Sequence, residues 1–277
     1  DQMLEDYGVA IVDFNEGSTV SYPQGHTAKE FFLAKPVQET DALINLCKMK
    51  THALERVTGG VKNLYGCISG LHKAKGHTKY TNADIFARQL IDLNQLIKPR
   101  FCVMDGIVAM DGNGPTSGDP VKMKVLLLGN DPVAIDSVYC HLVHLDPQMV
   151  PTNVHGETMG LGTWREENIR LLTDGGEITM QEAVERFGNP DFNVDRKKQR
   201  GNLWNRFNND FLRYFQKKPY IEADKCKKCG VCVEACPVEG KALQFKNGRR
   251  KPPVYNYHKC IRCFCCQEMC PHKAIQV

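Results

Sequence analysis

The C-terminal end of this sequence carries the same cysteine spacing twice, and that repetition constrains the chain more than any other feature. Each run has three cysteines separated by two residues, then a fourth cysteine three residues later that precedes proline: Cys226, Cys229, Cys232 and Cys236, then Cys260, Cys263, Cys266 and Cys270. Three closely spaced thiolates can wrap one corner of an iron–sulfur cube, but a loop this short cannot enclose the whole cube. The spacing therefore predicts two [4Fe–4S] clusters.

In this pattern the fourth cysteine of each run ligates the cluster of the other run. We therefore expect one cluster to be held by Cys226, Cys229, Cys232 and Cys270, and the other by Cys260, Cys263, Cys266 and Cys236. The alternative is a pair of zinc knuckles, but zinc sites use pairs of Cys-x2-Cys and not two four-cysteine runs ending in Cys-Pro. Residues 220–277 resemble bacterial two-cluster ferredoxins, and the extra thiol of Cys265 is expected not to be a ligand.

The remaining composition narrows the class of protein. Thirteen cysteines, an odd number with clustered spacing, argue against a secreted disulfide framework and for metal thiolates in a reducing cytoplasm. A net charge of +4 is too small to indicate nucleic-acid binding, and we expect no membrane span because no apolar run is long enough. The chain begins at Asp1, and we expect an upstream segment.

Three parts are expected along the chain. Residues 1–187 show short apolar runs at 9–14, 42–46, 101–104 and 125–128 and helical patterns at 83–93, 132–145 and 180–187. Alternating strands and helices predict a layered α/β sheet domain. Residues 188–219 are a linker with a helical apolar face from Leu203 to Phe215, which either docks the second domain or packs on the first. Residues 220–277 are the ferredoxin-like α+β domain.

Positive charge is concentrated in the cysteine-rich domain. Residues 220–277 contain 11 Lys and Arg against 5 Asp and Glu, which gives +6, while the rest of the chain sums to −2. Nearby cations raise the reduction potential of a cluster. The same lysines, among them Lys225, Lys227 and Lys228, could instead bind an acidic partner or form a solvated face.

The densest polar cluster of the larger domain follows the expected strand 42–46. Lysines here could bind an anionic substrate, histidines could carry protons or ligate metal, and a glycine pair lets a ligand approach the backbone. The candidate catalytic residues are Lys50, His52, Lys62, His77 and Asp105, and the candidate cofactor-binding residues are Gly59, Gly60 and Asn63. A solvent-facing basic loop, and simple turn chemistry at Asp105, are the alternatives.

Residues 33–163 resemble the uncharacterised family called domain of unknown function 362. The resemblance rests on residues 41–46, 48–52, 58–63, 105–115 and 131–134. It implies a frequent association with a ferredoxin module and names no reaction. A weaker resemblance, to the lactate racemase catalytic domain, rests on His52, Gly59, Gly60 and Lys62 and implies a shared scaffold and site location. That resemblance does not by itself predict a nickel cofactor.

These observations favour an iron–sulfur oxidoreductase that moves electrons between two [4Fe–4S] clusters and a small, anionic substrate in the larger domain. Two other functions remain open. The chain could be a non-enzymatic electron carrier whose larger domain binds a redox partner protein, or a scaffold for metal or cluster assembly. Loss of turnover on substitution of Lys62, with both clusters retained, would separate the enzyme from the carrier.

Overall fold

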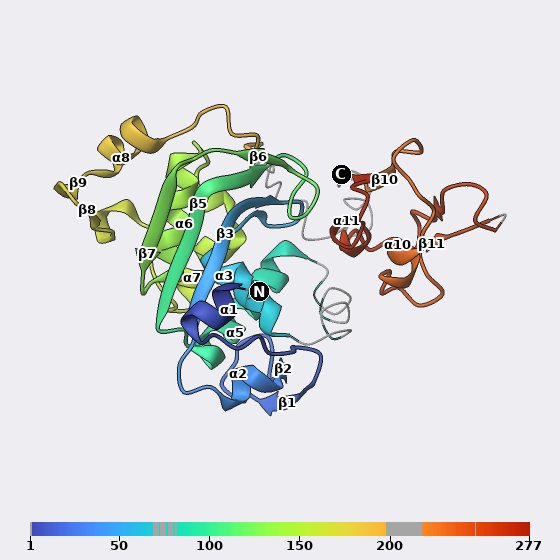
Figure 1. The fold of residues 1–277 in the computed structure, drawn as a ribbon, viewed down its shortest axis with the longest axis horizontal. Helices are drawn as coiled ribbons and strands as arrows, with labels where there is room; N and C mark the ends of the chain where they lie inside the picture. The colour runs from blue at the N-terminus through green and yellow to red at the C-terminus, as the bar shows by residue number, and fades with distance from the viewer. Residues whose placement is uncertain are drawn as a thin grey trace, which may run out of the picture.

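The computed structural model describes residues 2–68, 72, 76, 80, 82–197, 218–246 and 248–277. A five-stranded mixed sheet forms the centre of the larger domain (Figure 1). Its central pair, β3 and β5, is parallel, and the other strands pair antiparallel with one or the other of them. The strands are β3 (Ile44–His52), β4 (Arg56–Thr58), β5 (Phe101–Asp111), β6 (Asp119–Val121) and β7 (Val125–Gly129).

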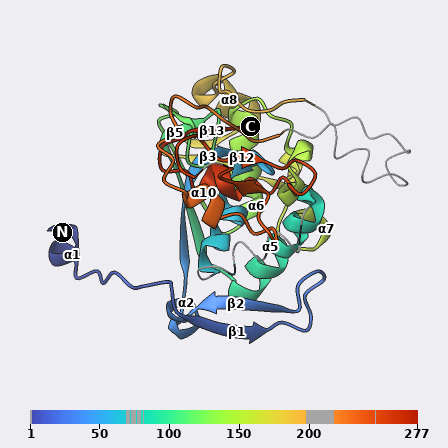
Figure 2. The same cartoon turned by 90° about the vertical axis from the view of Figure 1, so that its right-hand side faces the viewer.

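Helices cover one face of this sheet, as Figure 2 shows. They are α3 (Gly60–Asn63), α5 (Ala83–Ile97), α6 (Pro132–Leu142) and α7 (Pro151–Thr158). Side chains of β3 alternate, so that Cys47 and Met49 are buried while Ile44 and Leu46 are exposed on the opposite face. The layered α/β class expected from the sequence is therefore confirmed, with helices on one side only.

Local sequence patterns predict where the helices begin. The side chain of Asp131 accepts hydrogen bonds from Val133 N and Ala134 N and caps α6, as its position before Pro132 predicts. Thr179 and Glu182 form a capping box at the start of α8 (Met180–Phe187), and Gly188 follows its end. Both expected helix starts are confirmed, although α6 ends at Leu142 and α5 extends to Ile97.

Strand boundaries differ more from the sequence expectation. The strand expected at 42–46 runs on to His52, and the one expected at 101–104 runs on to Asp111, so polar segments interpreted as loops lie within strands. They fit because alternate residues bury apolar side chains, and because a register shift between Lys48 and Lys50 locally interrupts the pairing. The strand expected at 9–14 is wrong, because this segment is irregular and exposed.

Smaller elements complete the larger domain. A hairpin of β1 (Gly17–Ser21) and β2 (Glu30–Ala34) lies below the sheet, and the buried carboxylate of Asp92 in α5 accepts hydrogen bonds from the backbone of His26, Thr27 and Ala28. The remaining elements before the linker are α1 (Gln2–Tyr7), α2 (Lys35–Glu39), the 3-10 turns η1 (Leu64–Cys67), η2 (Pro147–Met149) and η3 (Glu166–Asn168), and the hairpin β8 (Leu171–Thr173) and β9 (Gly176–Ile178).

The C-terminal residues form a ferredoxin-type unit with an internal repeat. Two short antiparallel strand pairs and two single-turn helices make up this unit, which is the orange and red part of Figure 1. They are β10 (Tyr220–Ile221) with β13 (Ile275–Gln276), β11 (Leu243–Gln244) with β12 (Val254–Tyr255), α10 (Val231–Glu234) and α11 (Cys265–Glu268). The domain boundaries at 187 and 220 stay a prediction, and the apolar helix face expected at 203–215 lies outside the described residues.

Among the helices of the described ranges, none combines the length and the apolar character that crossing a membrane requires.

Candidate functional site

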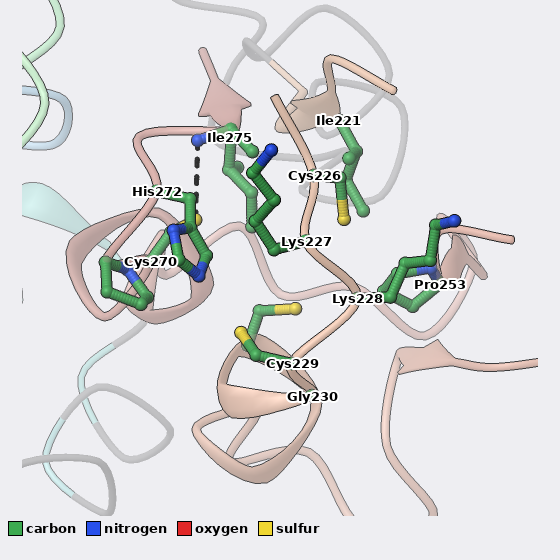
Figure 3. A pocket seen from close by; sticks show the side chains of 13 residues that line it. Ile221, Cys226, Lys227, Lys228, Cys229, Gly230, Pro253, Cys270, His272 and Ile275 are labelled. Carbon is green, nitrogen blue, oxygen red and sulfur yellow. Dashed lines mark hydrogen bonds between the residues drawn. The ribbon is translucent and has the colours of Figure 1, made fainter. Parts of the chain in front are cut away.

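Two cavities in the ferredoxin-type unit are lined by cysteines from both runs. The first, shown in Figure 3, is lined by Cys226, Cys229, Cys232 and Cys270, and the second by Cys236, Cys260, Cys263 and Cys266. We call them the first and the second thiol cavity. The structure thus brings the last cysteine of each run to the first three cysteines of the other.

The backbone around both cavities has the curvature that cluster-binding loops need. Lys228 and Gly230 have positive φ values of 58° and 92°, and the equivalent Arg262 and Phe264 have φ values of 57° and 59°. Such residues turn successive N–H groups toward the enclosed space, where they favour anionic sulfur. A matching pair of bonds runs from Ala242 N to Cys236 Sγ (3.3 Å) and from Ala274 N to Cys270 Sγ (3.4 Å).

The donor set also fits an iron–sulfur cluster. Burial, followed by the neighbouring thiols, raises the pKa of Cys232 to about 11, so four thiolates can gather here only around a strongly cationic centre. Within the described part of the chain, no three His, Cys, Asp or Glu side chains are arranged to hold a single metal ion. The cysteines instead surround a space, as ligands to the corners of a cube do.

The ferredoxin-type unit docks on the larger domain through α11. The buried side chain of Gln267 donates from Nε2 to Asn113 O (3.0 Å), Asn113 Oδ1 (3.0 Å) and Gly114 O (2.9 Å). Asn113 Nδ2 donates in return to Ile275 O (3.0 Å), and Thr116 Oγ1 donates to Glu268 O (3.0 Å). The glycine-rich loop after β5 is therefore a docking loop for the cysteine-bearing helix.

His52 is the second point of contact. Its Nε2 lies 2.9 Å from Glu268 Oε1, and its Nδ1 accepts from the backbone N–H groups of Leu54 and Glu55, both at 3.1 Å. Two donors at Nδ1 place the ring proton on Nε2, which donates to Glu268. The side chain is completely buried. Because both ring nitrogens are engaged, His52 positions α11, and its expected catalytic role stays a prediction.

Behind this contact lies a group of buried ionisable side chains. Lys62 in α3 is 9% exposed, and its Nζ lies 6.0 Å from the centre of the Phe86 ring. Glu55, in the turn between β3 and β4, is completely buried, and neither carboxyl oxygen has a hydrogen-bond partner among the described residues. Burial raises the pKa of Glu55 to about 8, although the positive charge of Lys62 opposes that rise.

Lys50 belongs to the same group. Burial lowers the pKa of Lys50, and the positive charge of Lys62 lowers it further, while the carboxylate of Glu268 raises it. The charge of Lys62 is close enough to lower the pKa of Lys50, and two neighbouring ammonium groups form a site that an anion would stabilise. The charge of Glu268 reaches this site from α11, so the buried lysines and the cysteine-bearing helix are electrostatic neighbours.

The glycine pair and Asn63 have structural roles. A Cβ on Gly59 would lie 2.0 Å from Asp136 Oδ1, and Gly60 N donates to the same oxygen at 2.5 Å. Both glycines therefore allow α6 to approach, and their expected role in binding a cofactor stays a prediction. The side chain of Asn63 donates to Asn45 Oδ1 (2.8 Å), which ties α3 to β3.

Asp105 does not join the lysine group. Asp105 lies on the sheet face without helices, where Lys48 forms an ion pair with it and lowers its pKa through a side-chain hydrogen bond. Both partners are about two-fifths exposed, so this is a surface pair and not an acid or base in a site. His77 lies outside the described residues.

Three contributors were missed from the sequence. Glu55 was not singled out, because a glutamate in a turn is normally exposed. Gln267 and Glu268 were passed over beside the cysteines, although Gln267 stands where the first run has Val233. That difference between the two runs is the signal that could have identified the docking helix.

Comparisons with known proteins match two separate parts of the chain. The family model described as domain of unknown function (DUF362) matches residues 1–141, and one described as a 4Fe-4S dicluster domain matches residues 218–271. A relative named thylakoid-associated protein sll1697, from Synechocystis sp., is 35% identical over 179 residues, which are 64% of this chain and 55% of the relative. The chain thus spans about half the length of that relative. No solved structure matches the chain.

Proposed function

The chain belongs to the DUF362 family and joins it to a 4Fe–4S dicluster domain, and from this premise we propose that it is an iron–sulfur oxidoreductase acting on a small, anionic substrate. The dicluster domain supports electron transfer as the general function of the chain. One observation carries the finer proposal: α11, which contains Cys266 of the second thiol cavity and is followed by Cys270 of the first, docks directly against the end of β3 that holds Lys50 and His52.

We assign the ligands crosswise. Cys226, Cys229, Cys232 and Cys270 would hold one [4Fe–4S] cluster, and Cys236, Cys260, Cys263 and Cys266 the other, because these sets line the first and the second thiol cavity. When bound, such clusters supply or accept electrons one at a time.

The chain's own residues supply the rest of the proposed site. Lys62 and Lys50 attract an anionic group, because two partly desolvated ammonium groups have no carboxylate bonded to them in the described structure. Glu55 holds a proton on its carboxyl at neutral pH, since its pKa of about 8 lies above 7, and can release that proton to a reduced substrate. His52 keeps α11 against this site.

The test uses the anaerobically reduced protein and, as oxidants, a panel of small carboxylic acids and phosphate esters that each carry a reducible carbonyl or alkene group. The visible absorbance of the clusters reports reoxidation. We expect at least one compound to reoxidise the wild type, and Lys62→Gln to slow that reaction at least about 100-fold without changing the iron content. Lys98→Gln, an exposed lysine on the same domain, is the matched control. Reoxidation of Lys62→Gln at the wild-type rate would contradict the proposal.

A second candidate function is a pure electron carrier. The exposure of Cys229, at the edge of the first thiol cavity, favours it because electrons could leave there to another protein. In that case no small compound would reoxidise the protein faster than it reoxidises an unrelated two-cluster ferredoxin.

A further inference from the structure

The two thiol cavities differ in their exposure. In the first cavity Cys229 is exposed and Cys226 and Cys270 are half-buried, whereas in the second all but Cys263 are buried. The first cavity is therefore the one that an external protein can approach.

Positive side chains surround this exposed cavity. Lys227 and Lys228 line it, and in Figure 3 Lys227 lies near Cys226 and Cys229 while Lys228 lies beside Pro253. The guanidinium of Arg249 lies over Gly230, where a Cβ would be 3.0 Å from its Nη2. We define the basic rim as Lys227 and Lys228, which line the cavity, Arg249, which lies by Gly230, and the basic residues next to Arg249 in the segment between β11 and β12, which are Lys246, Arg250 and Lys251.

In the described structure the basic rim has no carboxylate partners. Within the described residues, none of its six side chains forms an ion pair with a carboxylate, and five of them are exposed. Lys225 differs, because Glu222 pairs with it. A bound [4Fe–4S] cluster with its four thiolates would carry about −2, so most of the charge of the six cations would remain for an oppositely charged partner to offset.

We propose that the basic rim is the docking surface for an acidic one-electron carrier protein that exchanges electrons at the first thiol cavity. In each encounter the reduced carrier loses one electron and the iron–sulfur centre gains it, with no bond broken and no proton moved. Complementary charge steers such encounters and accelerates association. The proposal depends on the dicluster domain and not on the lysine site in the larger domain.

The sharpest test reverses charge on three exposed rim residues. Lys227→Glu, Arg250→Glu and Lys251→Glu are combined in one variant, and Lys98→Glu, Arg100→Glu and Lys122→Glu on the larger domain form the matched control. Reduced flavodoxin, which is acidic, is the probe, and stopped-flow absorbance gives the second-order rate constant. Binding of oxidised flavodoxin to the oxidised protein, measured by calorimetry, gives a readout that needs no electron transfer.

We expect the wild-type rate constant to fall about tenfold when the salt rises from about 0.05 M to about 0.5 M. At low salt the rim variant should react at least about tenfold more slowly and bind at least about tenfold more weakly than the wild type. The control should stay within about twofold of the wild type in both measurements. Cationic cytochrome c, used as an electron acceptor, should react faster with the rim variant than with the wild type. Equal iron content and reduction potential in all three proteins show that the clusters are intact.

Two results would overturn the proposal. One is a rim variant that binds and reacts with flavodoxin like the wild type. The other is cosedimentation of the wild type, but not the rim variant, with phosphatidylglycerol vesicles at about 0.15 M salt, which would assign the rim to an anionic membrane surface.

Discussion

The two halves of the ferredoxin-type unit share one cysteine spacing and face different surroundings. In α11 Gln267 is buried and bonds the larger domain, whereas the equivalent residue of α10 is Val233, and Glu268 reaches His52 while the equivalent Glu234 is exposed. The shared part of the repeat determines the metal-binding loops, and the residues between the cysteines decide which half is covered. A duplicated motif can thus give one buried and one exposed electron site.

The first prediction concerns Glu55, on the covered side. Its pKa is raised from 4.5 to about 8 on folding, so between these values the unfolded chain has lost the proton that the folded chain keeps. The free energy of unfolding therefore falls as pH rises through this window, by up to about 1.4 kcal/mol per pH unit. We expect Glu55→Gln to remove much of this fall, measured by urea unfolding at pH 5 and pH 8. Asp136, raised similarly to about 7, remains in both proteins. An unchanged pH dependence would show that Glu55 is paired.

The second prediction compares the equivalent helix positions. Gln267→Leu leaves the carbonyl groups of Asn113 and Gly114 buried without a donor, at a cost of about 2 to 4 kcal/mol. We expect proteolysis between the two domains to accelerate and the iron content to stay constant. Val233→Leu is the matched change in α10 and should leave the proteolysis rate unaltered. Equal sensitivity of the two variants would remove the distinction between a docked and a free helix.

The third prediction exchanges charge for a neutral amide at equivalent positions. Glu268→Gln weakens the charge-assisted hydrogen bond from His52 and should destabilise the domain contact by about 1 to 2 kcal/mol. Glu234→Gln, on the exposed half, should change stability by less than about 0.5 kcal/mol. Thermal unfolding of both variants is the measurement, and the comparison fails if Glu234→Gln has the larger effect.

The smallest effect is expected at Asp105. Asp105→Asn breaks an exposed ion pair with Lys48, which contributes less than about 1 kcal/mol. Stability and reoxidation of the reduced protein should both stay near wild type. A large loss of reoxidation would make Asp105 a catalytic residue after all.

Sequence reasoning succeeded where a local pattern determines a local structure. The cysteine runs and the helix caps at Asp131 and Thr179 are of this kind. It failed at strand ends, because polar residues such as Lys48 read as a loop although their neighbours Cys47 and Met49 are buried. Local polarity does not reveal how far a strand pairs.

The candidate site shows the same limit at longer range. Lys50 and Lys62 were found from composition, but the partners that define their environment, Glu55 and Glu268, come from a turn and from a helix more than 200 residues away in the sequence. The sequence suggested a catalytic role for His52, and its contact with Glu268 could not be foreseen. Burial and contacts between domains are tertiary properties, and the spacing of residues along the sequence does not encode them.

The crosswise arrangement of ligands can be tested directly by counting iron in two double variants. In this arrangement Cys229 and Cys270 serve the same cluster, whereas Cys229 and Cys236 serve different ones. We expect about eight irons per chain in the wild type, about four in Cys229→Ala/Cys270→Ala, and almost none in Cys229→Ala/Cys236→Ala. The opposite order for the two double variants, or zinc in place of iron in the wild type, would contradict the crosswise assignment.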